Sequence, residues 1–420
     1  MNNNKNKGIN SSKTLIIIGG GAAGFFCAIN AAKQNKNLCI IIIEKNNKVL
    51  SKVKVSGGGR CNVTHNCLDI AELSKNYPRG ENFLKKAFHW FNVKNTIDWF
   101  KEHNVELKTE DDGRMFPTSN SSDTIIDCFL SQINKFNIKL LLQTDIKKIV
   151  KEGSKFILET NGKEILKADF VCITAGGYSK IEQFDWFKVF NHIIIHPNPS
   201  LFTFNIPNNN IKELMGISVT KAKVKIINSK FQTEGPLLIT HWGLSGPAIL
   251  KLSSIAAREL ASLNYTFRIQ INWNADWNEV KVRNEIDSIK TIHPKQKIIN
   301  GNFLNFSNRL WLYFLQQSLI NDDLRWVDLT SKQINLLVKT ITNQEFEVKG
   351  KTTFKEEFVT CGGISLLEID VNTMQSKKVK NLFFAGEILD IDGITGGFNF
   401  QAAWTTAWLA AKTIATKSLD

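Results

Sequence analysis

Long hydrophobic runs are missing from this sequence. The longest apolar stretches, Leu15–Ile18 and Leu38–Ile43, are far shorter than the run of about 20 apolar residues that a membrane-spanning helix needs. The polar N-terminus, MNNNKNKGINSSK, also lacks the apolar core of a secretory signal peptide. We therefore expect a cytoplasmic protein without a membrane span.

Cysteine patterns typical of metal sites are missing as well. The seven cysteines are scattered, none forms a C-x-x-C motif, and no group of cysteine and histidine residues has the spacing of a zinc site. The sequence therefore predicts free thiols in a reducing compartment and no bound metal.

A dense basic block is also absent, although Lys and Arg outnumber Asp and Glu by 53 to 39 and the net charge is +14. A basic chain can bind RNA or an anionic substrate. Here the lysines are spread along the whole chain, and the Lys-rich stretches at 221–230 and 346–355 form no contiguous patch. We therefore expect a small-molecule partner rather than a nucleic acid, and the sequence indicates no particular oligomeric state.

The pattern at residues 14–44 is that of a strand, a glycine turn, a helix and a second strand. Thr14–Ile18 and Leu38–Ile43 are apolar throughout or nearly so, as strands of a parallel sheet buried on both faces require, and Ala22–Lys33 is rich in alanine. With 420 residues, the chain is long enough for two or three domains with separate cores.

The remaining chain divides by its periodicity. Helical spacing covers residues 82–104 and 122–136, and short strands are expected at Ile138–Leu142, Ile146–Glu152, Lys155–Thr160, Glu164–Leu166 and Phe170–Thr174. Residues 200–275 alternate as strands, residues 276–340 are helical, and the last helix is expected from about Phe400 to Thr416. We predict one α/β domain built from residues 1–195 and 358–420, with an insert made of residues 196–275, 276–340 and 341–357.

The glycine turn has the spacing of a dinucleotide-binding site. In GGGAAG (19–24), Gly19 permits a tight turn, Gly21 lets a pyrophosphate approach the backbone, and Gly24 lets the helix pack against the strand. The helix N-terminus attracts phosphate, and Glu44 ends the second strand where a carboxylate can bind a ribose. An ordinary glycine turn is the alternative.

A second glycine-rich loop, Lys52–Asn62, follows that ribose-binding strand. Glu44 alone does not separate FAD from NAD, because both contain an adenosine ribose. The added basic loop favours the longer cofactor FAD, with Ser56 and Arg60 near phosphate or flavin. The alternative for this loop is a flexible glycine linker.

These residues and four further motifs resemble a known family, the YhiN/BaiN-type NAD(P)/FAD-dependent oxidoreductases of the two-dinucleotide-binding flavoprotein class. The resemblance runs from Leu15 to Leu409 through GGGAAG (19–24), SGGGRCN (56–62), GRMFPTS (113–119), THWGLSGPAIL (240–250), TCGGISLLEID (360–370) and FFAGEILDIDGITGGFNFQAAW (383–404). It implies a Rossmann-like FAD-binding domain and an inserted β-barrel that carries a small helical unit. Phe398 stands where tyrosine is usual.

The C-terminal segment is expected to contact the flavin. The resemblance places Glu387 on the ribityl hydroxyls, and backbone N–H groups of Phe398 and Asn399 at the helix entry are candidates for stabilising negative charge on the flavin. A glycine-rich turn with a buried glutamate cap is the alternative. The full set of predicted cofactor residues is Gly19, Gly21, Ala22, Ala23, Gly24, Glu44, Lys45, Ser56, Gly58, Gly59, Arg60, Cys61, Asn62, Ala175, Gly176, Gly386, Glu387, Gly397, Phe398 and Asn399.

Two residues are candidates for catalysis. His241 is either a proton donor or substrate ligand, or a residue packed beside a helix cap formed by Ser245. Arg114 is either an anion clamp or part of a surface ion pair. Cys61 and Cys67 do not have the spacing of the redox pair in glutathione-reductase-like enzymes, which favours a structural or flavin-contacting thiol.

Taken together, these motifs predict an oxidoreductase with non-covalent FAD that transfers a hydride between flavin N5 and a small organic substrate. The single GxGxxG motif leaves no separate nicotinamide domain, so NAD(P)H would visit as a transient electron donor, in a cleft between the FAD domain and the insert. Three alternatives stay open: an amine oxidase that uses oxygen, an RNA-binding or RNA-modifying flavoprotein, and a flavin-stabilised structural module without turnover.

Overall fold

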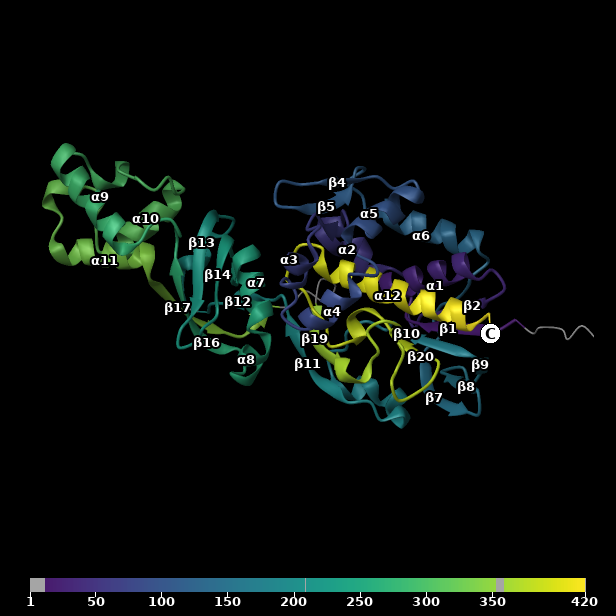
Figure 1. The fold of residues 1–420 in the computed structure, drawn as a ribbon. Helices are drawn as coiled ribbons and strands as arrows, with labels where there is room; N and C mark the ends of the chain where they lie inside the picture. The colour runs from purple at the N-terminus through teal and green to yellow at the C-terminus, as the bar shows by residue number, and fades with distance from the viewer. Residues whose placement is uncertain (1–11, 208, 353–358, 420) are drawn as a thin grey trace, which may run out of the picture. The chain divides into compact units, whose positions relative to one another are not determined.

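The computed structural model describes residues 12–207, 209–352 and 359–419. The polar N-terminal segment before residue 12 and the predicted boundary between residues 357 and 358 lie outside the described residues. The chain divides into two compact units (Figure 1). The first unit is formed by Met1–Pro199 and Lys355–Asp420, and the second by Ser200–Phe354.

A parallel sheet lies at the centre of the first unit. Its strand order is β20 (Leu382–Phe384), β10 (Phe170–Ile173), β1 (Thr14–Ile18), β2 (Cys39–Ile43) and β6 (Lys139–Leu141), and all four pairings are parallel. The central strand β1 is almost wholly buried, as its apolar composition predicts. The α/β class and the parallel sheet are therefore confirmed, and β20 adds a strand from the C-terminal part of the chain.

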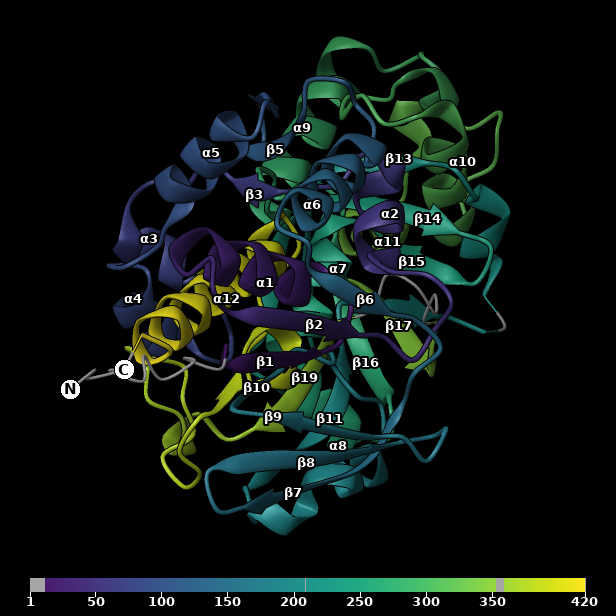
Figure 2. The ribbon, with the colours of Figure 1, turned by 90° about the vertical axis from the view of Figure 1, so that its right-hand side faces the viewer.

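Helices and a small antiparallel sheet cover the two faces of the parallel sheet. Figure 2 shows α1 (Ala22–Gln34) and α12 (Phe398–Lys417) together on one side. The strands β7 (Ile146–Glu152), β8 (Lys155–Thr160) and β9 (Ile165–Ala168) form the antiparallel sheet on the other. None of the described helices is both long and apolar enough to span a membrane.

The helical stretch expected at residues 82–104 is two helices. A new helix begins after Asn92. The Asn92 side chain accepts a hydrogen bond from the Lys94 N–H and forms a capping box with Asn95, so Asn92 is the N-cap of this second helix. The helices here are α3 (Ile70–Ser74), α4 (Glu81–Ala87), α5 (Val93–Glu102) and α6 (Asp123–Lys135). Beside them β3 (Thr64–His65), β5 (Arg114–Pro117) and β4 (Leu107–Thr109) form a three-stranded sheet.

The first unit is completed by a pair of strands and short 3-10 helices. Strand β11 (Ile194–Ser200) pairs with β19 (Val359–Ile364), which joins the two chain segments of the unit. The 3-10 helices are η1 (Ile181–Phe190), η5 (Leu366–Glu368) and η6 (Gly386–Ile388).

The second unit contains a seven-stranded antiparallel sheet. Its order is β17 (Gln344–Lys349), β16 (Thr266–Asn272), β13 (Ser218–Ile226), β14 (Gln232–Thr240), β15 (Gly243–Ser245), β12 (Thr203–Asn205) and β18 (Lys351–Thr352). No ladder between β17 and β18 is found among the described residues, so the predicted closed barrel is not found. The two outermost strands are nevertheless consecutive in the chain. Gly350 between them donates to the Tyr265 carbonyl and accepts from the Asn205 N–H.

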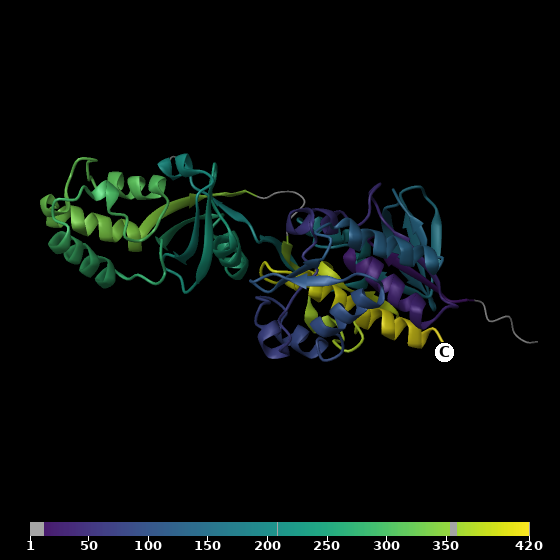
Figure 3. The ribbon, with the colours of Figure 1, turned by 90° about the horizontal axis from the view of Figure 1, so that it is seen from above.

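Helices pack against this sheet at two places. The inner face of the sheet is filled by α7 (Pro247–Ile255), which is followed by α8 (Ala257–Ser262). Figure 3 shows the other helices, in green, gathered near one end of the sheet. They are α9 (Glu279–Ile292), α10 (Asn308–Gln317) and α11 (Ser331–Thr342), with the 3-10 helices η3 (Ile298–Asn300) and η4 (Trp326–Asp328); η2 (Asn210–Leu214) contacts β14.

Candidate functional site

The glycine turn after β1 has two glycines that pack tightly and one that faces open space. Gly19 has φ +117°, and a β-carbon there would lie 2.4 Å from the Thr174 carbonyl oxygen. A β-carbon on Gly24 would lie 2.0 Å from the Gly19 oxygen, so helix and turn meet without side chains between them. A β-carbon on Gly21 would meet nothing within 4 Å. The turn therefore leaves its backbone accessible where a pyrophosphate would approach.

The helices α1 and α12 both begin after a glycine and without a side-chain cap. α1 starts after Gly21 and α12 after Gly397, and neither has an acidic residue in its first turn. The first N–H groups of a helix have no intrahelical acceptor, and the helix dipole places partial positive charge there. A β-carbon on Gly386 would lie 2.9 Å from that of Ala23, so the end of β20 lies against the first turn of α1. Both helix ends are suited to anionic groups of a cofactor.

Glu44 is anchored to the glycine turn. Its Oε2 accepts from the Gly20 N–H at 2.9 Å, and its Oε1 accepts from the Asn46 N–H at 2.9 Å and from Asn46 Nδ2 at 2.7 Å. A carboxylate has about four acceptor positions, so these bonds orient the group and leave room for a hydroxyl donor. Lys45 is exposed, and its Nζ lies 5.9 Å from the centre of the Tyr178 ring.

The second glycine loop is partly helical, which differs from the loop predicted at 52–62. α2 (Ser51–Gly59) begins at Ser51, and the helical conformation is lost at Ser56, where ψ is 146°. Gly57, Gly58 and Gly59 then have φ values of +60°, +70° and +84°. Such a left-handed run is accessible to glycine without strain. β-carbons on Gly58 and Gly59 would meet nothing within 4 Å, so this backbone also faces open space.

The side chain of Arg60 folds back against its own loop and against Phe116. Its guanidinium lies 4.0 Å from the centre of the Phe116 ring, and its Nε donates to the Gly57 carbonyl at 3.3 Å. Arg60 Nη1 is 2.5 Å from Glu110 Oε1, and Arg114 Nη2 is 3.2 Å from Glu110 Oε2. Arg114 also pairs with Asp112 at 2.7 Å. Both arginines therefore form ion pairs with carboxylates. For Arg114 this arrangement corresponds to the alternative of an ion pair.

Cys61 and Asn62 connect the loop to its surroundings. Burial raises the pKa of the Cys61 thiol to about 12, with an opposing contribution from its hydrogen bond with Ser56. Burial also raises the pKa of Cys67, and both residues are free thiols. With its amide oriented to satisfy both neighbours, Asn62 donates to the Thr64 carbonyl and accepts from the Gly397 N–H, each at 3.0 Å. Asn62 therefore joins the loop to the start of α12.

Glu387 lies where three chain segments meet. Its Oε1 accepts from the Thr360 N–H at 2.9 Å, and its Oε2 is 2.6 Å from Lys52 Nζ. A β-carbon on Gly177 would lie 2.8 Å from Glu387 Oε1, so the turn that follows β10 through Ala175 and Gly176 passes close to this carboxylate. The sequence patterns gave no role to Lys52, because its partner is 335 residues away.

The entry to α12 is held by its own side chains and by the β3 segment. Asn399 Oδ1 accepts from the Gly393 N–H at 2.8 Å, and its Nδ2 donates to the Gly393 carbonyl at 2.9 Å. Phe398 is buried, and its ring stacks on that of His65 with a centroid distance of 4.7 Å. The side chains of both predicted flavin contacts are therefore structural, and only their backbone N–H groups could face a cofactor.

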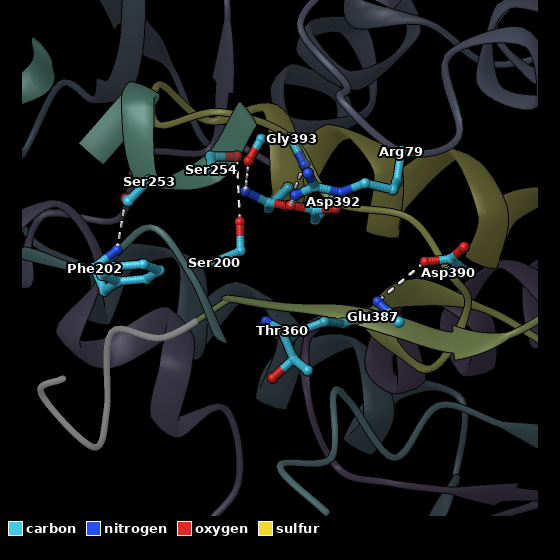
Figure 4. A network of polar contacts seen from close by, with 12 residues as sticks. Arg79, Ser200, Phe202, Ser253, Ser254, Thr360, Glu387, Asp390, Asp392 and Gly393 are labelled. Atoms are coloured by element: carbon cyan, nitrogen blue, oxygen red, sulfur yellow. Dashed lines mark hydrogen bonds and ion pairs between the residues drawn. The ribbon is translucent and has the colours of Figure 1, made fainter. Parts of the chain in front are cut away.

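Residues 76–80 contact the segment that leads into α12. The sequence analysis did not identify these contacts. Arg79 and Asp392 are buried and form a two-bonded ion pair, with Arg79 Nε 2.5 Å from Asp392 Oδ1 (Figure 4). Tyr77 donates its hydroxyl to the Phe398 carbonyl at 2.7 Å, and the Ile394 N–H donates to the Asn76 carbonyl at 2.9 Å. The segment between α3 and α4, residues 75–80, contains Pro78 and Gly80, which indicate a turn, but nothing in the sequence indicates its contact with Asp392.

His241 belongs to the second unit, and no predicted cofactor residue lies within the part of the sequence that forms this unit. It is exposed in the two-residue turn, His241–Trp242, that joins β14 to β15, and its ring lies edge-on to Trp242 at 4.3 Å. The predicted helix cap at Ser245 is wrong. Ser245 ends β15, and Gly246, with φ +92°, caps α7, whose first residue is Pro247.

The residues present fit a dinucleotide. Predicted residues from four separate segments lie in the first unit and are linked to one another by the contacts above. They supply open glycine backbone at Gly21, Gly58 and Gly59, two uncapped helix ends, and an oriented carboxylate at Glu44. This donor set has the chemistry that phosphates and ribose hydroxyls require.

Comparisons with known proteins give the family and two related activities. The model described as HI0933-like protein Rossmann domain matches residues 13–413. The chain is 29% identical to a protein of Escherichia coli (strain K12) named ribosomal RNA dihydrouridine synthase, over 94% of this chain and 96% of that protein. It is 22% identical to the 3-dehydro-bile acid delta(4,6)-reductase of Clostridium scindens, over 93% of this chain and 96% of that protein.

A solved structure agrees with the fold. The 3-ketosteroid delta1-dehydrogenase of Sterolibacterium denitrificans matches with a TM-score of 0.51 and 11% identity, covering 97% of this chain and 100% of that chain. This likeness concerns the fold alone. Because the family model covers nearly the whole chain, the protein belongs to the HI0933-like Rossmann family of YhiN/BaiN-type flavoproteins, and it is a flavin-dependent oxidoreductase.

Proposed function

We propose that the protein is an FAD-dependent reductase that converts uridine to dihydrouridine in ribosomal RNA. The observation that carries the proposal is the match to the ribosomal RNA dihydrouridine synthase of Escherichia coli, which covers 94% of this chain and 96% of that protein. A match of that length includes both units, so the insert as well as the flavin unit has a counterpart. The net charge of +14 also favours a polyanionic substrate.

The proposed reaction is reduction of a carbon–carbon double bond conjugated to a carbonyl. Dihydrouridine differs from uridine by one hydrogen on each of C5 and C6, so the base takes up a hydride at C6 and a proton at C5. When bound and reduced, FAD would supply the hydride. NAD(P)H is proposed as the donor that reduces the flavin, so that overall one NAD(P)H and one proton are consumed and one NAD(P)⁺ is released.

Residues of the first unit bind and orient the cofactor in this proposal. Glu44 accepts hydrogen bonds from the adenosine ribose, and the uncapped N-terminus of α1 receives the pyrophosphate. Glu387 holds the ribityl hydroxyls. Backbone N–H groups of Phe398 and Asn399 at the start of α12 stabilise negative charge near the flavin by roughly 0.3–2 kcal/mol.

His241 is proposed as the proton donor to C5 of the base. Its imidazole is exposed at a short hairpin turn, so it can meet a substrate, and a histidine can give up a proton near neutral pH. Arg114 is less suited to an anion clamp, because Asp112 and Glu110 already neutralise its guanidinium.

A second candidate is reduction of a small conjugated ketone. It is favoured by the bile acid reductase relative, which aligns with 93% of this chain at 22% identity. Its name describes double bonds at positions 4 and 6 of a 3-oxo steroid, which are conjugated to a carbonyl as in uracil. This candidate corresponds to the small organic substrate expected from the sequence alone.

The test uses FAD-loaded full-length protein with NADPH or NADH under anaerobic conditions. One arm contains ribosomal RNA transcribed in vitro, which has no prior modification, and dihydrouridine is measured by mass spectrometry of the digested nucleosides. The other arm contains a 3-oxo-4,6-diene steroid and follows its absorbance. Dihydrouridine in the RNA supports the proposal. Loss of the diene without dihydrouridine favours the second candidate, and no product in either arm contradicts both.

A variant tests the role of His241 in the same assay. His241→Ala should keep its FAD content and lower the rate of product formation about 10²–10⁴-fold. The cofactor content should not change, because all predicted cofactor residues lie in the first unit. An unchanged rate would remove His241 from the proposed mechanism.

A further inference from the structure

We propose that the outer face of the sheet in the second unit, centred on Lys223 and Lys225 of β13, binds the sugar–phosphate backbone of RNA. This inference rests on the proposed function, because it names the surface that would hold that substrate. The outer face is defined here by the exposed side chains of β13, β14, β16 and β17, opposite the face that packs on α7.

The alternation of β13 separates the two faces. Val219, Ala222, Val224 and Ile226 are buried in the core of the second unit, whereas Lys221, Lys223 and Lys225 are exposed. Lys223 and Lys225 are two residues apart, so their stems are about 7 Å apart along one face of the strand. The buried half of the strand requires no lysine opposite it, so the run of three lysines is not dictated by packing.

The acidic groups on this face are paired with other cations. Lys221 lies 2.5 Å from Asp276 and 3.8 Å from Glu234. Two other ion pairs on this face join Arg268 to Glu345 and Lys349 to Glu347. Among the described residues, Lys223 and Lys225 have no carboxylate within ion-pair distance. Lys225 has no acidic residue beside it in the register, whereas Lys223 lies across from Glu234, a carboxylate that is also 3.8 Å from Lys221. The charge of Lys223 is therefore only partly compensated.

The neighbours of these lysines are mostly neutral and polar. The register places Lys225 between Gln232 of β14 and Gln270 of β16, and Lys223 beside Asn272 of β16. Amide side chains can hydrogen-bond phosphate oxygens and the 2′-hydroxyl of RNA. Lys230, in the turn after β13, is also exposed. The surface therefore combines uncompensated charge with hydrogen-bonding groups, as backbone recognition requires.

Among the described residues of this face, no exposed aromatic ring offers a platform for stacking bases. Phe267 of β16 and Phe346 of β17 are both buried on the inner side. Sequence-tolerant RNA binding by stacking needs exposed rings, and base readout needs access to base edges. The chemistry here fits contact with phosphates and sugars, so binding at this face should depend strongly on salt and weakly on sequence.

The experiment measures RNA binding by the full-length, FAD-loaded protein. The probe is a fluorescein-labelled fragment of ribosomal RNA transcribed in vitro, titrated at 50–200 mM KCl (about the range over which phosphate contacts weaken). The test variant is Lys223→Ala/Lys225→Ala. The control is Lys332→Ala/Lys339→Ala, which removes the same charge from exposed positions on α11 of the same unit.

The test variant should bind at least 10-fold more weakly at 100 mM KCl, and the slope of log Kd against log salt should fall by about 1.5, as expected for two lost phosphate contacts. The control should stay within about 2-fold of wild type. FAD content and reduction of the flavin by NAD(P)H should be unchanged in both variants.

Equal weakening by the test and control variants would overturn the inference, because it would mean that only net charge matters. Equal competition by poly-L-glutamate, matched to the RNA in charge, would also overturn it in favour of an acidic protein partner. The proposed function fails separately. If the test variant weakens RNA binding but wild type forms no dihydrouridine, the RNA-binding surface is supported and the proposed reaction is refuted. If the test variant forms dihydrouridine as well as wild type at limiting RNA, the proposed reaction is supported and the RNA-binding surface is refuted.

Discussion

The buried ion pair between Arg79 and Asp392 gives the sharpest test of how the first unit holds the loop that contains Asp392 and leads into α12. The exposed fraction is 8% for the Arg79 side chain and 0% for Asp392. Removing one partner of a buried pair leaves an uncompensated charge and costs about 3–5 kcal/mol. We therefore expect Asp392→Asn to lower the free energy of unfolding by that amount. The melting temperature of the unit should fall by about 6–15 °C.

The assay is thermal unfolding followed by circular dichroism, with and without FAD. Glu102→Gln is the matched control, because Lys33 and Glu102 form an ion pair whose side chains are 49% and 61% exposed. An exposed pair contributes about 0–1 kcal/mol, so the control should melt within about 3 °C of wild type. The double variant Arg79→Met/Asp392→Asn should be less destabilised than the sum of its single variants, because neither charge is then left alone.

The same variant should weaken FAD binding. The loop that contains Asp392 leads directly into the first turn of α12, and Tyr77 and Asn76 bind it on either side. With the ion pair lost, we expect the dissociation constant for FAD to rise roughly 10-fold, which is about 1.4 kcal/mol. If Asp392→Asn shifts melting no more than Glu102→Gln does, the pair does not hold the loop and the reasoning is wrong.

Three further predictions concern single side chains of the first unit. Glu44→Ala should weaken FAD binding by about 1–3 kcal/mol in a flavin fluorescence titration, and an unchanged dissociation constant would remove Glu44 from the site. Because burial raises the pKa of Cys61 to about 12, iodoacetamide at pH 8 should label the exposed Cys39 and leave Cys61 unlabelled. The variant Cys61→Ser should reduce its flavin at a rate within a few-fold of wild type. Burial lowers the pKa of His103 and His192 in the folded state, so stability should fall as the pH drops below about 6.5, where the unfolded chain takes up protons first; a flat melting temperature between pH 7.5 and 5.5 would contradict this.

The sequence was informative where a feature is local. β1 and β2 are continuous apolar runs, and a strand buried on both faces needs such a run whatever its neighbours are. The same holds for the glycine turn, where the roles of Gly19 and Gly24 follow from how closely a strand and a helix must meet. Strand β8 was predicted with its observed bounds, because the Asn-Gly turn that follows it has a local backbone preference.

Prediction failed where several local tendencies compete. Residues 82–104 have helical periodicity throughout, yet Asn92 satisfies backbone N–H groups at a new helix start, and that hydrogen bonding interrupts the periodic pattern. The basic loop at 52–62 begins as a helix because Ser51–Val55 has no glycine or proline to prevent it. The closed barrel was a property of the resemblance, and the strand pairings of the described residues do not complete it.

The candidate site shows a different limit, because its charged residues are paired over long separations. Lys52 with Glu387 and Arg79 with Asp392 are each more than 300 residues apart in the chain. A motif names which residue types a cofactor needs, but it carries no information on which distant side chain neutralises or orients them. Arg60 illustrates the consequence: its position beside the glycines predicts a place near phosphate or flavin, but nothing in the motif indicates its ion pair with Glu110. A basic residue in a glycine loop is therefore weak evidence for an anion site until its carboxylate neighbours are known. Open glycine backbone, as at Gly21 and Gly58, is the stronger sign, because no side chain of the protein can occupy that space.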